Sequence, residues 1–163
     1  MKNILNISTI ELIVYDFDGV MTDNTVFIDD SGNEMVRVNR SDGLGISEIK
    51  KIGIEQIIVS TEKNLVVTER AKKLNLTCMH GIDDKQKTVS DYCNKNNIDL
   101  KNVAYIGNDI NDKDVMKIVG LKFCPADAHQ DIKQISDYVL NAKGGKGVIR
   151  EIFDYIKGGL KSE

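Results

Sequence analysis

Residues 12–20 read Leu-Ile-Val-Tyr-Asp-Phe-Asp-Gly-Val, and this stretch decides the fold class. Its first four residues form an apolar run, which is typical of a strand buried in a parallel sheet. Asp16 and Asp18 follow directly, so we expect them where a central strand ends, the edge at which ligands bind in open α/β sheets. Because two carboxylates this close repel each other, a cation or a phosphoryl reaction explains the pair better than core packing does.

Strand-like and helix-like segments alternate along the rest of the chain, which predicts a doubly wound α/β fold with a parallel, Rossmann-like sheet. Residues 26–38 break the alternation and predict a β-hairpin inserted after the first strand, with its turn at Asp30-Ser31-Gly32. We expect one domain over residues 1–157 and a frayed tail over residues 158–163. Strands are expected at residues 11–15, 55–59, 76–79, 102–106, 121–123 and 138–140, and helices near residues 43–52, 65–74, 85–96, 112–119 and 148–156.

Composition narrows the class of protein. The chain has 163 residues, a net charge of -3 and a hydrophobic fraction of 41%. The charge argues against nucleic acid as the main partner, and neither a membrane-spanning run nor a signal-peptide core is visible. Three scattered cysteines without a CxxC pair fit reduced thiols, so we expect a cytoplasmic protein.

The Asp16/Asp18 pair suggests phosphoryl chemistry. In an extended backbone the two side chains point the same way and can face one pocket. One carboxylate could act as a nucleophile and form an acyl phosphate, while the other protonates the leaving alcohol and later activates water. A bound Mg²⁺ would offset their repulsion and the charge of the substrate. On this motif alone, two surface acids in an ordinary loop are an equal alternative.

Three further segments carry polar residues at strand ends or helix starts. Residues 107–112, Gly-Asn-Asp-Ile-Asn-Asp, offer oxygen ligands for Mg²⁺, although Asn and Asp also cap helices. Ser60 could bind a phosphate oxygen together with the N–H groups of the next helix, or it could simply cap that helix. Lys85 or Lys87 stands at a helix start, where a lysine opposes the helix dipole, and could neutralise a phosphoryl group; a solvated lysine is the alternative.

The order of these motifs resembles the haloacid dehalogenase superfamily of phosphohydrolases. The resemblance implies a Mg²⁺-dependent phosphatase in which Asp16 is the nucleophile and Asp18 is the general acid and base, binding the metal through its carbonyl. It also implies that Ser60 and Lys85 hold the transferring phosphoryl group, and that Asp112 belongs to the last motif. The implied metal ligands are Asp16, Asp18, Asn108 and Asp109.

More specifically, the chain resembles the branch of 3-deoxy-manno-octulosonate 8-phosphate and nonulosonate 9-phosphate phosphatases. The resemblance lies in residues 16–23, the hairpin, and residues 40–46, 103–109, 125–128 and 144–151. It implies a phosphorylated 2-keto-3-deoxy sugar acid of sialic acid or Kdo biosynthesis as the substrate. It also implies a homotetramer whose hairpins meet around an axis.

Spacing agrees with an enzyme that lacks a cap domain. Only 41 residues separate Asp18 from Ser60, and 47 separate Ser60 from Asn108. The expected helices and strands use both gaps, so a neighbouring subunit is the expected cover of the active site.

Residues 61–73 resemble the nonulosonate enzymes, because octulosonate enzymes tend to carry an arginine where Glu62 stands. Glu62 could accept hydrogen bonds from sugar hydroxyls or an amine, and Arg70 or Lys73 could pair with the substrate carboxylate. A helix surface with i,i+4 ion pairs is the alternative. Thr61 and, across a subunit interface, Arg150 complete the expected substrate contacts. The favoured substrate is a nonulosonate 9-phosphate, and octulosonate 8-phosphate is the alternative.

One residue departs from the family pattern. The last motif usually begins Gly-Asp-Asp, whereas here it reads Gly107-Asn108-Asp109. An amide oxygen can still coordinate a metal, but one negative charge is lost, so weaker metal binding is predicted. Some domains fused to cytidylyltransferases resemble this variant, which leaves open a weakly active assembly module associated with a CMP-sugar synthetase. The intact catalytic motifs favour an enzyme.

Overall fold

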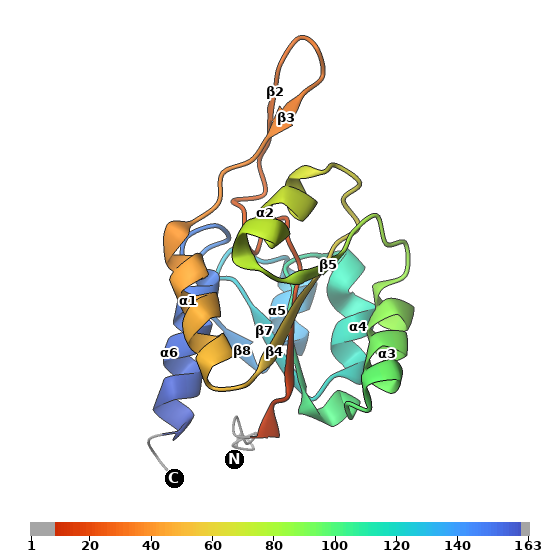
Figure 1. Ribbon diagram of the computed structural model, residues 1–163, viewed down its shortest axis with the longest axis vertical. Coiled ribbons are helices and arrows are strands. Elements are labelled where there is room, and N and C mark those ends of the chain that lie inside the picture. Colours follow the sequence, from red (N-terminus) through yellow and green to blue (C-terminus); the bar gives the residue numbers. More distant parts are fainter. Residues whose placement is uncertain (1–8, 161–163) are drawn as a thin grey trace.

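The structure, a computed structural model, describes residues 9–160. A six-stranded parallel sheet has the order β5-β4-β1-β6-β7-β8, and a two-stranded hairpin, β2-β3, projects from it (Figure 1). The elements are β1 (Leu12–Tyr15), β2 (Phe27–Ile28), β3 (Glu34–Met35), α1 (Arg40–Lys51), β4 (Glu55–Val59), α2 (Val66–Leu74), β5 (Thr77–Met79), α3 (Lys85–Asn96), η2 (Leu100–Asn102), β6 (Val103–Ile106), η3 (Ile110–Asp112), α4 (Lys113–Ile118), β7 (Leu121–Cys124), α5 (Gln130–Ile135), β8 (Tyr138–Val139) and α6 (Val148–Leu160).

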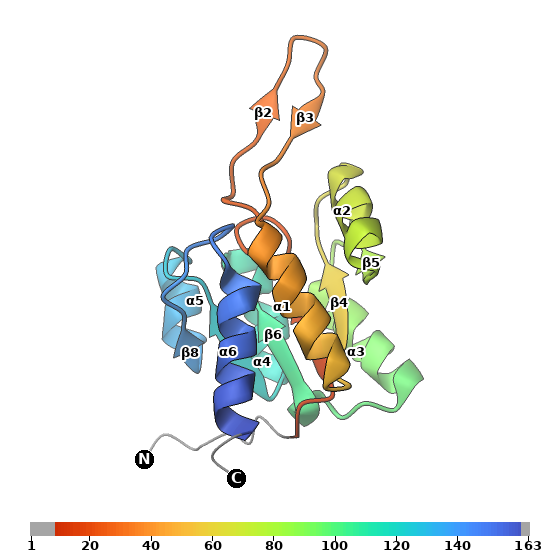
Figure 2. The same cartoon turned by 60° about the vertical axis from the view of Figure 1, so that its left-hand side comes forward.

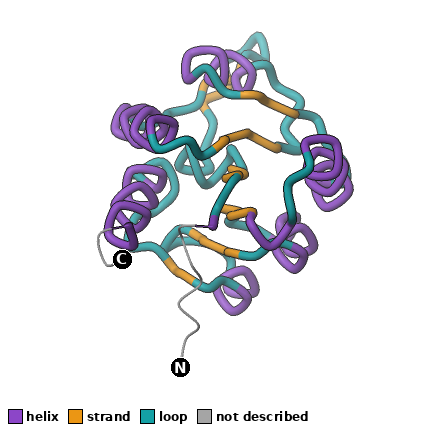
Figure 3. Tube along the Cα trace, turned by 60° about the horizontal axis from the view of Figure 1, so that its bottom comes forward, coloured by secondary structure: helices purple, strands orange, loops and turns teal. Residues whose placement is uncertain are grey.

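Helices cover both faces of the sheet because successive strand residues point to opposite sides (Figure 3). In β1, Ile13 and Tyr15 join the core that α1, α2 and α6 cover, whereas Leu12 and Val14 join the core under α3, α4 and α5. All four side chains of β1 are buried, which explains the uninterrupted apolar run.

The winding of the chain reverses between β1 and β6. The helices that follow β1 and β4 pack on one face, whereas those that follow β5, β6 and β7 pack on the other. The reversal opens a crevice at the carboxyl ends of the strands, the usual ligand site of such sheets. Asp16, Ser60 and Asn108 follow the adjacent strands β1, β4 and β6 at this edge.

The predicted sheet and its hairpin insertion are confirmed, and the insertion between β1 and β4 within residues 9–160 consists of the hairpin and α1. The hairpin strands have only two residues each, and Figure 2 shows them standing clear of the body. The short helix α5 was not expected. Its six residues carry few apolar side chains, and its N-cap residue is a histidine, His129, which does not mark a helix start in the sequence. The helix α6 continues to Leu160, and residues 161–163 lie outside the described part. The domain boundary and the frayed tail stay predictions.

No helix within residues 9–160 is both long enough and apolar enough to cross a membrane.

Candidate active site

A buried lysine joins two aspartates at the centre of the site. The Lys85 Nζ atom lies 2.9 Å from Asp16 Oδ1 and donates to Asp112 Oδ1 at 2.8 Å. All three side chains are almost fully removed from solvent. Asp84 caps α3 by accepting from the Lys87 backbone N–H, which fixes the direction in which Lys85 leaves the helix. Lys87 itself pairs with Asp91 on the surface, so Lys85 is the lysine of this site.

The Asp112 carboxylate holds the last motif together through hydrogen bonds. Its Oδ1 also accepts from the Tyr105 hydroxyl at 2.7 Å, and its Oδ2 accepts from the Asn108 N–H at 2.9 Å. A Cβ atom on Gly107 would lie 2.6 Å from the Asp112 side chain, so only glycine leaves room for this packing. The sequence placed Asp112 in the motif without giving it a role, and the structure shows it as the common partner of Lys85 and the loop.

Burial and charge perturb the two aspartates and the lysine. Burial raises the pKa of Asp16, and the neighbouring Asp112 raises it further, while Lys85 acts in the opposite direction. Burial lowers the pKa of Lys85, but Asp16 and Asp112 together outweigh this effect and raise it, so the lysine stays charged. Because Lys85 is shared between two carboxylates, ionised Asp16 calls for additional positive charge nearby.

The side chains of Asp16 and Asn108 and the carbonyl of Asp18 converge where that charge is needed. The Asn108 amide donates from Nδ2 to the Asp18 carbonyl oxygen at 2.9 Å and to Asp16 Oδ2 at 3.1 Å. If the amide turns over, its Oδ1 takes the same position, and the three oxygens could then surround a cation. A carboxylate, a carbonyl and an amide oxygen form the donor set of a hard divalent cation. Within residues 9–160, no three His, Cys, Asp or Glu side chains are grouped to hold a metal.

Asp18 is suited to proton transfer. Burial raises its pKa, and Glu62 raises it further. A raised pKa lets a carboxyl group carry a proton closer to neutral pH, as a general acid requires.

The catalytic cavity has a volume of about 390 Å³. Ser60 is buried beside it, and its Oγ accepts from the Glu62 N–H, which leaves the hydroxyl hydrogen free to donate to another group. Asn24 lies on the cavity wall and was not predicted, because it stands in a loop where an amide is an ordinary turn residue. Asn111, in η3 and within the predicted segment 107–112, also lies on this wall. The lining residues are Asp16, Asp18, Asn24, Thr61, Asn108, Asp109, Ile110 and Asn111.

Asp109 serves the local backbone as well as the cavity. Its Oδ1 accepts from the Ile110 N–H at 2.7 Å and caps η3. Its role as a metal ligand stays a prediction.

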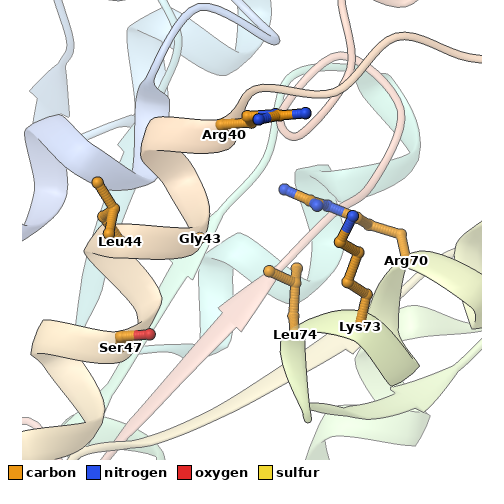
Figure 4. A pocket seen from close by; sticks show the side chains of 7 residues that line it. All are labelled: Arg40, Gly43, Leu44, Ser47, Arg70, Lys73 and Leu74. Atoms are coloured by element: carbon orange, nitrogen blue, oxygen red, sulfur yellow. The ribbon is translucent and has the colours of Figure 1, made fainter.

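A second cavity, the cationic pocket, lies between α1 and α2 and has a volume of about 550 Å³. Arg40 reaches it from α1, and Arg70 and Lys73 reach it from α2, so that their nitrogen atoms converge (Figure 4). No carboxylate within residues 9–160 forms an ion pair with these three side chains. The pocket is therefore suited to an anion. The sequence predicted Arg70 and Lys73, whereas Arg40 was missed because the first turn of α1 was expected to start later.

Arg150 lies apart from both cavities. Its guanidinium group stacks on the Phe153 ring, 5.8 Å from the centroid, on the exposed side of α6. Its expected substrate contact across an interface stays a prediction.

Comparisons with known proteins agree with this geometry. Residues 45–152 match the family described as haloacid dehalogenase-like hydrolase. The chain belongs to this family. The 3-deoxy-D-manno-octulosonate 8-phosphate phosphatase KdsC of Escherichia coli K12 is 36% identical over 148 residues, which span 90% of this chain and 79% of the relative.

Solved structures of hydrolases of this family share the whole architecture. A protein of Streptomyces avermitilis assigned to the same family superposes with a TM-score of 0.91 at 41% identity, covering 94% of this chain and 88% of the other. The octulosonate 8-phosphate phosphatase of Moraxella catarrhalis, in a complex with magnesium, phosphate and KDO, has a TM-score of 0.92 at 28% identity and covers 98% and 92%. The chain is thus a haloacid dehalogenase-type phosphatase related to KdsC.

Proposed function

We propose that this phosphatase removes phosphate from a phosphorylated 2-keto-3-deoxy sugar acid, most specifically a nonulosonate 9-phosphate, through an aspartyl-phosphate intermediate. The observation that carries the reaction is the buried bridge from Lys85 to Asp16 and Asp112, beside the Asp18 carbonyl and the Asn108 amide. This arrangement holds a nucleophile and positive charge against a phosphoryl group.

The reaction uses two carboxyl groups in turn. A carboxylate oxygen of Asp16 attacks phosphorus, the bond to the sugar oxygen breaks, and protonated Asp18 donates its proton to that oxygen. The ionised Asp18 then accepts a proton from water as the water attacks phosphorus and releases Asp16. Lys85 and Ser60 stabilise charge on the phosphoryl oxygens.

We assign the divalent cation site to Asp16 Oδ2, the Asp18 carbonyl and Asn108 Oδ1, with Asp109 nearby, and propose Mg²⁺ as the ion. When bound, it would supply positive charge to offset that of the phosphate and of Asp16. Asn108 provides a neutral ligand where related hydrolases usually carry an acid, so we expect weaker affinity than a third carboxylate would give.

The substrate class rests on the cationic pocket and on Glu62. A sugar acid carries a carboxylate in addition to its phosphate, and Arg40, Arg70 and Lys73 offer that anion unpaired positive charge. Glu62 raises the pKa of Asp18 electrostatically, and we propose that its carboxylate accepts hydrogen bonds from the sugar that leaves. The carboxylate at position 62 supports nonulosonate 9-phosphate as the substrate. Enzymes that act on octulosonate 8-phosphate tend to carry an arginine at this position.

The test is phosphate release from nonulosonate 9-phosphate, octulosonate 8-phosphate and p-nitrophenyl phosphate, each with Mg²⁺ and with chelator. We expect Mg²⁺-dependent release and the highest kcat/KM with the nonulosonate. Preference for octulosonate 8-phosphate, the substrate named for the KdsC relatives, would correct the sugar while keeping the reaction. Equal rates with all three compounds would refute a sugar-acid substrate.

Asn108 favours a second candidate, a weakly active assembly module that partners a CMP-sugar synthetase. Phosphate release no greater than that of an Asp16→Asn variant at any Mg²⁺ concentration would favour this candidate over the enzyme.

We also propose that the functional unit is a homotetramer joined through the hairpins. Phe27 and Ile28 are 67% and 65% exposed on a hairpin that packs against little else, and such a two-stranded element is unstable alone in water. Light scattering of the wild type and of a Phe27→Ser/Ile28→Ser variant tests this assembly. We expect a tetramer that the double substitution dissociates; a wild-type monomer with full activity would refute it.

A further inference from the structure

Three segments that are distant in the sequence meet at Asn39, and a fourth is one hydrogen bond further on. Its Oδ1 caps α1 by accepting from the Ser41 N–H at 2.8 Å, and its Nδ2 donates to the Gly145 carbonyl at 3.4 Å. Its backbone carbonyl accepts from Arg70 Nη2 at 3.0 Å. Gly145 in turn donates its N–H to the Val20 carbonyl at 3.0 Å. These bonds form a continuous connection from the cationic pocket to the loop that carries the two catalytic aspartates.

The catalytic end of this connection is a tight turn. The Phe17 carbonyl accepts from the N–H groups of residues 20–22, which closes the turn behind Asp16 and Asp18. Gly144 and Gly145 cover its outer side so closely that a Cβ on Gly144 would lie 2.3 Å from the Gly19 carbonyl oxygen. Movement of the backbone at residues 144–145 would therefore displace the turn.

At the cationic pocket, the connection ends at the guanidinium group of Arg70, which makes two kinds of contact. Arg70 lines the cationic pocket, and it also donates to the Asn39 carbonyl. Its Nε atom is buried without a hydrogen-bond partner, so the side chain is not fully fixed by the protein alone. An anion that draws Arg70 into one orientation also sets the position of Asn39.

We propose that Asn39 is a positioning residue that couples capture of the substrate carboxylate at Arg70 to alignment of the Asp16–Asp18 turn. The proposal rests on the proposed function, since it assumes a substrate that carries both a phosphate and a carboxylate. Asn39 touches neither group; it acts through the Arg70 and Gly145 contacts on either side of it.

The test compares two substrates in variants that spare the fold. Asn39→Ser keeps a good helix cap but is too short to reach Gly145, and Arg70→Lys keeps the charge but loses the planar donor fork. With the preferred sugar acid phosphate, we expect Asn39→Ser to lower kcat about tenfold with little change in KM. With p-nitrophenyl phosphate, which has no carboxylate, we expect a change of less than about twofold, because this reaction already proceeds without the coupling.

Non-additivity distinguishes coupling from two separate defects. Arg70→Lys should lower the ratio of sugar-acid to aryl phosphate kcat/KM about tenfold, and the double variant should lower it about tenfold as well, rather than a hundredfold. Fully multiplicative effects would overturn the proposal. So would an Asn39→Ser variant that slows both substrates equally, since that is the result of a lost cap alone.

A matched control is Asp99→Ser, which alters the cap of η2 at the amino end of β6, away from both cavities. It should leave both rates unchanged. Asn39→Asp provides a second variant if Asn39→Ser unfolds, because it keeps the cap and replaces the Nδ2 donor with a charged acceptor.

Amide hydrogen exchange separates this proposal from the substrate assignment. Without Mg²⁺, sulfate added as a probe of the cationic pocket should slow exchange at residues 19–22 and 145 in the wild type but not in Asn39→Ser. If the wild type shows no preference for a sugar acid phosphate, the substrate assignment fails while this protection pattern still supports the coupling. Absence of protection in the wild type overturns the coupling.

Discussion

The catalytic cavity and the cationic pocket present opposite arrangements of charge. In the first, one lysine is shared between two buried carboxylates, so negative charge exceeds positive charge. In the second, three cations face a cavity, and no described carboxylate forms an ion pair with them. The first cavity is therefore suited to a cation and the second to an anion. The predictions below test how far this contrast holds.

The largest effect is expected at the nucleophile. Asp16→Asn should lower Mg²⁺-dependent phosphate release by roughly 10⁴-fold or more, because a neutral amide cannot form the acyl phosphate. Steady-state kinetics measure the loss, and Asp91→Asn, on the surface beside Lys87, is the matched control. Full activity in Asp16→Asn would remove the nucleophile assignment.

The shared lysine tests the electrostatic balance of the catalytic cavity. Lys85→Met should lower kcat by about 10³-fold, through loss of charge at the phosphoryl group. It should also destabilise the fold by roughly 3 kcal/mol, because Asp16 and Asp112 lose their common buried partner. Urea unfolding measures the second effect. Lys87→Met, which breaks only an exposed pair, should change both quantities little.

The cationic pocket is tested by removing its charge. Arg70→Gln should raise KM for the sugar acid phosphate by about 10²-fold, the expected loss from a charge-assisted hydrogen bond, while KM for p-nitrophenyl phosphate stays within about twofold. Equal increases in KM for both compounds would show that the pocket does not bind the carboxylate of the sugar acid. Lys72→Gln, whose side chain pairs with Glu69 outside the pocket, controls for a general loss of positive charge on α2.

Restoring an acid at position 108 tests whether this residue is a metal ligand. Asn108→Asp should lower the Mg²⁺ concentration for half-maximal activity about tenfold, because a charged ligand replaces a neutral one. Asn111→Asp adds the same charge to the cavity wall away from the three oxygens and is the control. If both variants respond equally, the effect is one of overall charge, and Asn108 is not a ligand.

The smallest effect concerns Asp42, a buried acid behind the cationic pocket. Burial raises its pKa to about 6, although it accepts from the Arg150 and Ile149 N–H groups. The folded state therefore holds this proton more tightly than the unfolded state does, and stability contributed by the protonated form is lost as pH rises from about 4 to about 6. The unfolding free energy of the wild type minus that of Asp42→Asn should increase by roughly 2 kcal/mol as pH falls from about 6 to about 4. A difference that is constant with pH would contradict this assignment.

The contrast between the cavities also explains what could be predicted. The predicted catalytic residues follow directly after strands or open a helix, so local patterns and motif order were enough to single out Asp16, Asp18, Ser60, Lys85 and Asn108, whose roles stay predictions. The cationic pocket is formed by faces of α1 and α2, whose relative placement depends on tertiary packing. Arg40 and Asn39 could not be recognised for that reason, since each looks like an ordinary residue at a helix start. Asp112 was visible in its motif, but its burial and its four donors were not.

The glycines at residues 144–145 have a consequence for biosynthesis. They cover the outer side of the catalytic turn, which lies more than a hundred residues earlier in the chain. During translation the nucleophile emerges early, and its turn stays uncovered on that side until the last part of the domain has left the ribosome. We therefore expect nascent chains to be inactive for most of their synthesis, so that catalytic competence coincides with completion of the fold.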